Sequence, residues 1–199
     1  MDQDFGTNCA SNGLMRRHFF PKPYADAVAR LRVFLGFAMV AAFLYFSHPT
    51  ARSLEIGLPV SLCGLGLRAW AAGHLRKNQK LANSGPYAMT RNPLYLGTFI
   101  AALGLACAGR SVAVAVLFTL VFLLVYLPAI ELEEQHLTAI LPEYGEYAAR
   151  VPLILPRWPE SLGCQRFSFS QYRRNREYEA LLGWSIGAAW LIARVAVGF

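Results

Sequence analysis

Two stretches of the sequence, residues 84–97 and 131–156, gather the polar side chains that could do chemistry in an otherwise apolar chain. In the first stretch, Asn92 followed by Pro93 predicts an abrupt helix start, with asparagine at the N-cap and proline at the first helical position. The free N–H groups of such a start, with Arg91 beside them, favour an anion such as a carboxylate. The alternative is an interfacial cap in which Arg91 contacts lipid phosphate.

The second stretch begins where a long apolar run ends, with the sequence ELEEQHL. On a continuing helix Glu131 and Glu134 share a face, because residues three apart are neighbours there. Carboxylates at the end of an apolar run are costly in lipid, so they should meet water, a cation or each other. Pro142 then predicts the end of the helix, and residues 150–156, with prolines at both 152 and 156, predict an extended strap over the helices.

The two stretches together predict a cationic helix start and an acidic helix end that converge on a zwitterionic ligand. S-adenosylmethionine, with its carboxylate, ammonium, sulfonium and flat adenine, fits this description, as do other ligands. The alternative for the second stretch is a solvated helix end that follows a membrane span and binds nothing.

The elements that must position these residues are membrane helices. Of 199 residues 55% are hydrophobic and 16% charged, whereas a soluble domain carries about a quarter charged residues. Because the apolar residues fall in long runs, the sequence predicts an all-α integral membrane bundle, a single membrane domain of about five transmembrane helices. The predicted spans are residues 28–46, 54–72, 94–108, 112–130 and 181–197.

Charge places these spans relative to the membrane. Arginine and lysine precede the first predicted span, separate the second from the third and follow the fourth. By the positive-inside rule, the N-terminus and both polar stretches are expected to be cytoplasmic. The net charge of +7 is spread between apolar runs, so no nucleic-acid partner is expected. The four cysteines and four histidines are dispersed, so no metal site is expected either.

The polar stretches resemble a known family. Gly85-Pro-Tyr87, the string Arg91-Asn-Pro-Leu-Tyr95-x-Gly97 and the later pair Glu133-Glu134 with Leu137 resemble the isoprenylcysteine carboxyl methyltransferases, which are related to the phospholipid N-methyltransferases. The resemblance implies a helical membrane protein that binds S-adenosylmethionine at the cytoplasmic boundary and takes a lipid-like acceptor sideways from the bilayer. It implies catalytic roles for Arg91 and Glu134. It also implies a cofactor site at Tyr87, Arg91, Asn92, Pro93, Tyr95, Gly97, Glu133, Glu134, His136 and Leu137.

This sequence departs from the family pattern at two places. Asn92 stands where the family usually has histidine, which keeps a helix cap but removes an imidazole. Leu141-Pro142 stands where Phe-Gly is common. The cofactor side is therefore expected to be retained and the acceptor side to have diverged. Residues 166–199 lie beyond the resemblance and are expected to be able to cover an acceptor cavity.

Three functions remain open from the sequence. The leading prediction is methyl transfer from S-adenosylmethionine to a lipophilic or amphiphilic carboxylate, thiol or amine, with membrane lipids as surroundings. The second is an NADPH-dependent membrane reductase of the sterol-reductase type, whose members share a similar arginine-proline-tyrosine segment. The third is a non-catalytic membrane protein that uses the polar cluster structurally.

Overall fold

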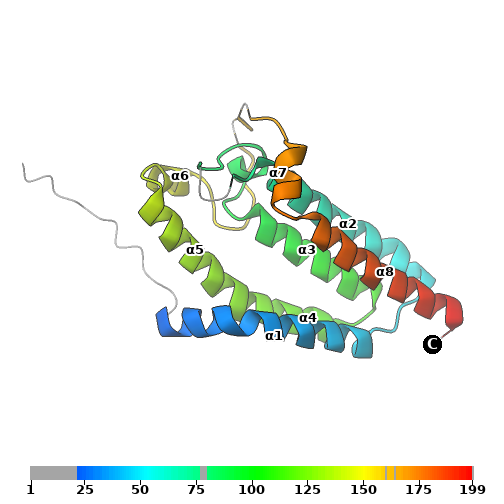
Figure 1. The fold of residues 1–199 in the computed structure, drawn as a ribbon. Coiled ribbons are helices and arrows are strands. Elements are labelled where there is room, and N and C mark those ends of the chain that lie inside the picture. The colour runs from blue at the N-terminus through cyan, green and yellow to red at the C-terminus, as the bar shows by residue number, and fades with distance from the viewer. Residues whose placement is uncertain (1–21, 77–79, 160, 164, 199) are drawn as a thin grey trace, which may run out of the picture.

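The computed structural model describes residues 22–76, 80–159, 161–163 and 165–198; within residues 22–33, only the side chain of Tyr24 is described. Throughout these residues the secondary structure is helical, without a strand (Figure 1). The predicted all-α class is confirmed.

Five apolar helices lie at the predicted spans. They are α1 (Lys22–Phe46), α2 (Ala51–His74), α3 (Pro93–Ala108), the continuous helix formed by α4 (Val112–Val121), η2 (Phe122–Tyr126) and α5 (Leu127–Ile140), and α8 (Tyr178–Val197). Short helices η1 (Gly85–Ala88), α6 (Tyr144–Arg150) and α7 (Phe169–Arg174) lie in the connections.

Three of these helices are long and apolar enough to cross a membrane: α2, the 112–140 helix and α8. The apolar part of α1 at Phe34–Phe46 and the whole of α3 are shorter. The described residues thus provide three candidate spans where the sequence predicted about five, and they indicate an integral membrane protein.

Two predicted boundaries shift for physical reasons. Helix α2 begins at Ala51 because Thr50 and Ser53 form a reciprocal capping box, with N–H to hydroxyl distances of 2.9 and 3.3 Å. The span predicted at residues 112–130 belongs to a longer helix that runs on through its polar residues to Ile140. It ends just before Pro142, as expected.

Helices α2 and α3 form a tightly packed antiparallel pair. A Cβ atom on Gly64 would overlap the backbone of Ala101, and one on Gly104 would overlap that of Ser61. The Ser61 hydroxyl donates to the Ala101 carbonyl at 2.7 Å. Small residues therefore bring the two backbones together, which holds the start of α3 at a fixed place beside the end of α2.

A wide helical turn, η2, redirects the 112–140 helix toward the start of α3. Pro128 follows this turn and has no N–H to donate. The Tyr24 hydroxyl on α1 donates to the Leu124 carbonyl, four residues before the proline, at 2.8 Å. In Figure 1, α5 leaves the line of α4 at this turn and rises toward α6. Because of the bend, the acidic residues of α5 lie near the start of α3, next to Arg91.

The C-terminal part packs on α2 through polar contacts that the sequence did not indicate. Arg68 in α2 binds both carboxylate oxygens of the buried Glu177 at 2.6 and 3.1 Å, and it also contacts the Thr98 hydroxyl. At the opposite end, Arg194 donates to the Ser47 carbonyl at 2.8 Å, beyond the last turn of α1. These contacts fix α8 along the bundle.

Candidate functional site

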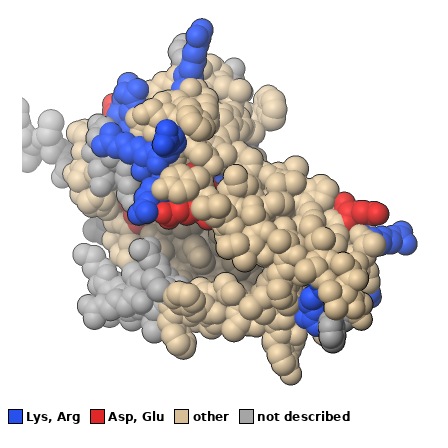
Figure 2. All heavy atoms as spheres, turned by 45° about the vertical axis from the view of Figure 1, so that its right-hand side comes forward, with Lys and Arg blue, Asp and Glu red and all other residues tan. Residues whose placement is uncertain are grey.

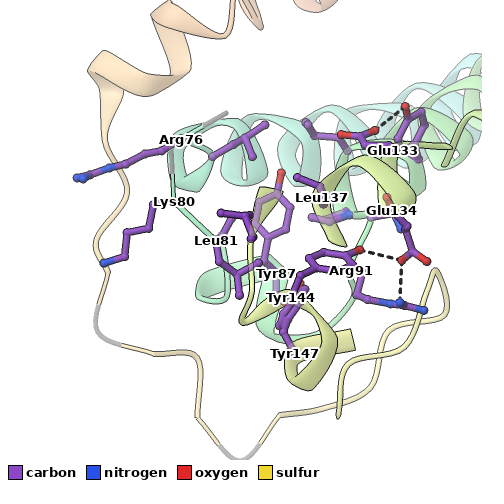
Figure 3. Close-up of a pocket in the computed structure, with 17 residues that line it drawn as sticks. Arg76, Lys80, Leu81, Tyr87, Arg91, Glu133, Glu134, Leu137, Tyr144 and Tyr147 are labelled. Carbon is purple, nitrogen blue, oxygen red and sulfur yellow. Dashed lines mark hydrogen bonds and ion pairs between the residues drawn. The ribbon is translucent and has the colours of Figure 1, made fainter. Parts of the chain in front are cut away.

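One pocket lies where the start of α3, the acidic part of α5, the segment after α2 and α6 converge (Figure 3). The space inside the pocket, including open solvent at its mouth, is about 700 Å³. The lining residues are Leu75, Arg76, Lys80, Leu81, Ala82, Tyr87, Arg91, Asn92, Pro93, Leu94, Tyr95, Glu133, Glu134, Leu137, Leu141, Tyr144 and Tyr147.

The floor of the pocket is apolar and well packed. Leu81, Tyr144, Tyr147 and Ala148 form a buried cluster against which Leu137 and other partly buried side chains of α5 and α6 pack. The Tyr147 hydroxyl donates to the carbonyl of Tyr87 at 2.8 Å, so α6 is tied to η1. This floor provides a surface on which a flat or apolar group can rest out of water.

The entry to η1 depends on glycine. Gly85 has a φ of +59°, and a Cβ atom there would meet the ring of His74. Its N–H donates to the carbonyl of Leu162 at 2.7 Å. The Gly-Pro turn therefore fits tightly between α2 and the chain after α6 and points Tyr87 into the pocket.

The chain after α6 forms the predicted strap and is bonded to the residues before α3. The Arg91 N–H donates to the carbonyl of Pro152 at 2.9 Å. The Thr90 hydroxyl donates to Leu153 and Ile154, at 3.2 and 3.0 Å. These bonds fix the backbone that carries Arg91.

The predicted capping role of the Asn92 side chain is wrong. Asn92 does stand at the N-cap, but its side chain makes no capping hydrogen bond. Instead its Nδ2 donates to the carbonyl of Leu153 at 3.1 Å. The strap brings the Leu153 carbonyl close by, and the Asn92 amide binds it instead of the helix N–H groups. Asparagine here joins the strap to α3.

The basic and acidic walls of the pocket touch directly. Arg91 Nη1 lies 2.8 Å from Glu134 Oε1, and the two side chains are only 11% and 14% exposed. The contact is an ion pair without hydrogen-bond alignment: Arg91 Nε and Nη1 are buried and have no hydrogen-bond partner among the described residues. Glu134 compensates the charge of this buried guanidinium, and an anionic ligand group could supply hydrogen bonds that the ion pair leaves unmade.

Tyrosine hydroxyls orient both carboxylates (Figure 3). Tyr144 donates to Glu134 Oε1 at 3.0 Å, and Tyr95 donates to Glu133 Oε2 at 3.0 Å. Figure 3 shows Glu134 between Arg91 and Tyr144, whereas Glu133 turns to the α3 side. The two neighbouring glutamates therefore point to different parts of the pocket wall.

The pocket keeps its tyrosines neutral. Burial raises the pKa of Tyr87, Tyr144 and Tyr147 well above the usual value for tyrosine; for Tyr144 the nearby Glu134 carboxylate raises the pKa further. These hydroxyls therefore act as hydrogen-bond donors at physiological pH and do not serve as proton acceptors.

Eight of the ten residues predicted for the cofactor line the pocket, and Gly97 and His136 do not. Gly97 packs against Arg68 and Gly64 of α2, so its missing side chain serves helix contact. His136 lies on an exposed part of α5. Their roles in cofactor binding stay predictions that this geometry does not favour.

Other lining residues lie on the segment that follows α2. In the sequence, Arg76 and Lys80 indicate only the orientation of the spans, and no feature of Leu81 points to a site. All three residues line the pocket. The one sequence feature that favours a site here is the cluster of basic residues just after the second predicted span. No pocket-lining residue in the described part of the chain follows Tyr147, so the expectation that residues 166–199 cover the cavity finds no support in this pocket.

Comparison with known families supports the resemblance. Residues 59–144 match the model of the phospholipid methyltransferase family, which confirms the predicted likeness to these membrane methyltransferases. All lining residues except Tyr147 fall within the matched range.

Two curated relatives carry names that refer to metal resistance. The cobalt-zinc-cadmium resistance protein CzcN of Cupriavidus metallidurans is 41% identical over 102 residues, which cover 50% of this chain and 47% of the relative. The nickel-cobalt-cadmium resistance protein NccN of Alcaligenes xylosoxydans xylosoxydans is 36% identical over 111 residues, 54% of this chain and 52% of the relative. The chain thus spans about half the length of these relatives. No solved structure matches significantly.

Proposed function

We propose that the chain is an S-adenosylmethionine-dependent membrane methyltransferase that acts on a lipophilic or amphiphilic acceptor. The observation that carries the proposal is the position of Arg91. Arg91 lines a pocket built almost wholly from the region that matches the phospholipid methyltransferases, and its buried Nε has no hydrogen-bond partner among the described residues.

The pocket residues suit the chemical groups of this cofactor. The guanidinium of Arg91 suits the carboxylate of a methionine moiety, since guanidinium binds carboxylate with two aligned N–H groups. The carboxylates of Glu133 and Glu134 suit the ammonium group, and the tyrosines and leucines of the floor suit an adenine ring. When bound, S-adenosylmethionine would supply an electrophilic methyl group on its sulfonium.

The residues of the chain would contribute orientation and exclusion of water. Methyl transfer is an in-line displacement, so alignment of donor and acceptor accounts for much of the rate. Arg91, whose backbone is bonded to the strap, would hold one end of the cofactor, while Leu81 and Leu137 keep water from the floor. A carboxylate or thiolate acceptor needs no base; for an amine acceptor, Glu133 or Glu134 would accept the proton.

The relatives suggest the physiological setting. Their names refer to resistance to cobalt, zinc, cadmium and nickel. The described residues contain no group of three or more histidine, cysteine or acidic side chains that could hold a metal ion. We propose that the chain contributes to metal tolerance by modifying an acceptor at the membrane.

Transfer of labelled methyl groups tests this function. Purified protein in lipid nanodiscs is supplied with methyl-labelled S-adenosylmethionine and a total lipid extract, and organic-soluble label is measured. We expect label in the lipid fraction with wild-type protein and a loss of at least about tenfold with Arg91→Ala, as for removal of a charge-assisted bond.

The exposed Arg150 at the end of α6 provides the matched control, and Arg150→Ala should keep wild-type transfer. Thermal stabilisation by NADPH without stabilisation by S-adenosylhomocysteine would favour the reductase instead. If neither ligand stabilises the protein and no label is transferred, the proposal fails.

A further inference from the structure

The chain between α6 and α8 exposes large apolar side chains outside every candidate span. Leu155 is 80% exposed, Trp158 84% and Phe169 63%. Exposed leucines and phenylalanines on the long helices are explained by lipid contact, but Leu155 lies on the strap, Trp158 just after it and Phe169 on α7. We call the described residues 155–159, 161–163 and 165–174 the interfacial segment.

Hydrogen bonds hold the interfacial segment at the level where the spans end. The Arg157 N–H donates to Met89, shortly before α3 begins, at 2.9 Å. The Ser168 N–H donates to Gly73, in the last turn of α2, at 3.0 Å. Since α2 is a candidate span that ends at His74, a segment bonded to its last turn would lie at the depth of lipid headgroups when α2 crosses a membrane.

Exposed arginines alternate with the apolar residues of the segment. Arg157, Arg166, Arg173 and Arg174 are all exposed. The sequence of residues 155–174 contains these four arginines and a single acidic residue, Glu160. Figure 2 shows a large group of basic side chains at one end of the molecule, further charged side chains at the opposite end, and a wide surface without charges between them. Aromatic and basic side chains at headgroup depth are the combination found in surface-bound membrane segments.

A small cavity beside the segment is lined by groups that can bind a lipid headgroup. The space inside it, including open solvent, is about 380 Å³. Its lining includes Arg76, Arg166, Gln165 and Gln171. Two guanidinium groups and two amides provide donors of the kind that bind phosphate oxygens.

We propose that the interfacial segment docks on the membrane surface at the pocket end of the protein and selects anionic phospholipids. Trp158 and Phe169 insert among the upper acyl chains, and the arginines bind lipid phosphates and the excess negative charge. The segment lies beyond residue 144, where the family match ends, so this surface belongs to the part of the chain outside that match. An acidic soluble protein is the competing occupant, and the experiment below separates the two.

Quenching by brominated lipids tests the proposal without any cofactor. The full chain is placed in nanodiscs that contain either phosphatidylcholine or phosphatidylglycerol brominated near the top of the acyl chains. The emission of Trp158 is taken as the difference between wild type and Trp158→Phe. We expect both lipids to quench it, with an apparent association at least about threefold stronger for phosphatidylglycerol, since each arginine near the surface adds to anionic-lipid attraction.

Charge reversal at matched positions identifies the residues responsible. Arg173→Glu/Arg174→Glu should abolish the preference for phosphatidylglycerol, and Arg166→Glu alone provides a second test if the double variant does not fold. Arg52→Glu/Arg110→Glu changes two exposed arginines near the other ends of α2 and α3 and should keep the preference. Trp158 emission that no brominated lipid quenches would overturn membrane docking, and equal quenching by the two lipids would overturn anionic selectivity. Either result is independent of whether the pocket binds S-adenosylmethionine.

Discussion

Arg91 owes its position to contacts on both its backbone and its side chain. The strap accepts the hydrogen bond from its N–H, and Glu134 lies against its guanidinium. Tyr144 binds the same glutamate oxygen, so the carboxylate cannot rotate freely away from the arginine. A ligand with a carboxylate would complete the hydrogen bonds of a cation that is already positioned. This arrangement reduces the ordering cost of binding.

Substitution of Asn92, a single residue, tests the connection between the strap and the pocket. Asn92→Ala removes the donor that binds the Leu153 carbonyl, and the loss of one such bond costs about 1 kcal/mol. We expect a lower thermal midpoint and faster amide exchange in residues 151–154, measured by hydrogen exchange in nanodiscs. Unchanged exchange in this segment would show that Asn92 does not hold the strap.

The burial of Tyr147 predicts that the stability of the folded protein depends on pH. Burial raises its pKa above the usual value of 10, so its neutral form is favoured in the folded protein. The stability that this contributes is fully present below about pH 10. It is lost as pH rises from the unfolded pKa through the higher folded pKa. We expect thermal midpoints to fall above about pH 10 in wild type and to fall less in Tyr147→Phe. Replacement of the exposed Tyr178 by phenylalanine should keep the wild-type profile, and identical profiles for all three proteins would contradict the assignment.

At the element scale, two glycines of α2 that stand two residues apart have opposite surroundings. A Cβ on Gly64 would overlap the backbone of α3, whereas a Cβ on Gly66 would meet nothing within 4 Å. Gly64→Ala should therefore separate α2 from α3 and destabilise the protein by about 1–3 kcal/mol, a cost typical of overpacking. Gly66→Ala should be neutral or stabilising by up to about 1 kcal/mol, because alanine is the better helix former. Thermal denaturation of both variants measures the difference, and equal effects would contradict the packing.

Most helices and their ends could be predicted from the sequence, whereas the contacts between them could not. Apolar runs and proline signals predicted the helices, the stop before Pro142 and the strap, because local chemistry determines these features. The partner of the Asn92 side chain, the packing of Gly97 and the pairing of Arg68 with Glu177 depend on residues distant in the chain. Local patterns carry no information about them. His136 follows two pocket glutamates in sequence, but only the bend at η2 decides which side of α5 reaches the pocket.

At the scale of the whole molecule, the chain divides into a matched region that builds the pocket and a later region that holds it from outside. The lining residues end at Tyr147, whereas the carbonyls of Pro152 and Leu162 accept hydrogen bonds from the N–H groups of Arg91 and Gly85. Helix α8 is joined to α2 through Glu177 and Arg68. The later region therefore contributes to the proposed cofactor site indirectly, through the positions of Gly85 and Arg91.

Equilibrium binding of S-adenosylhomocysteine tests the central claim most directly. Calorimetry on the purified protein in nanodiscs should show binding to wild type and to Arg150→Ala with the same affinity. Arg91→Ala should weaken binding by about ten- to a hundredfold, as expected for loss of a hydrogen bond to a charged group. Full retention of affinity in Arg91→Ala, or no binding to the wild type, would contradict the assignment of this pocket to S-adenosylmethionine.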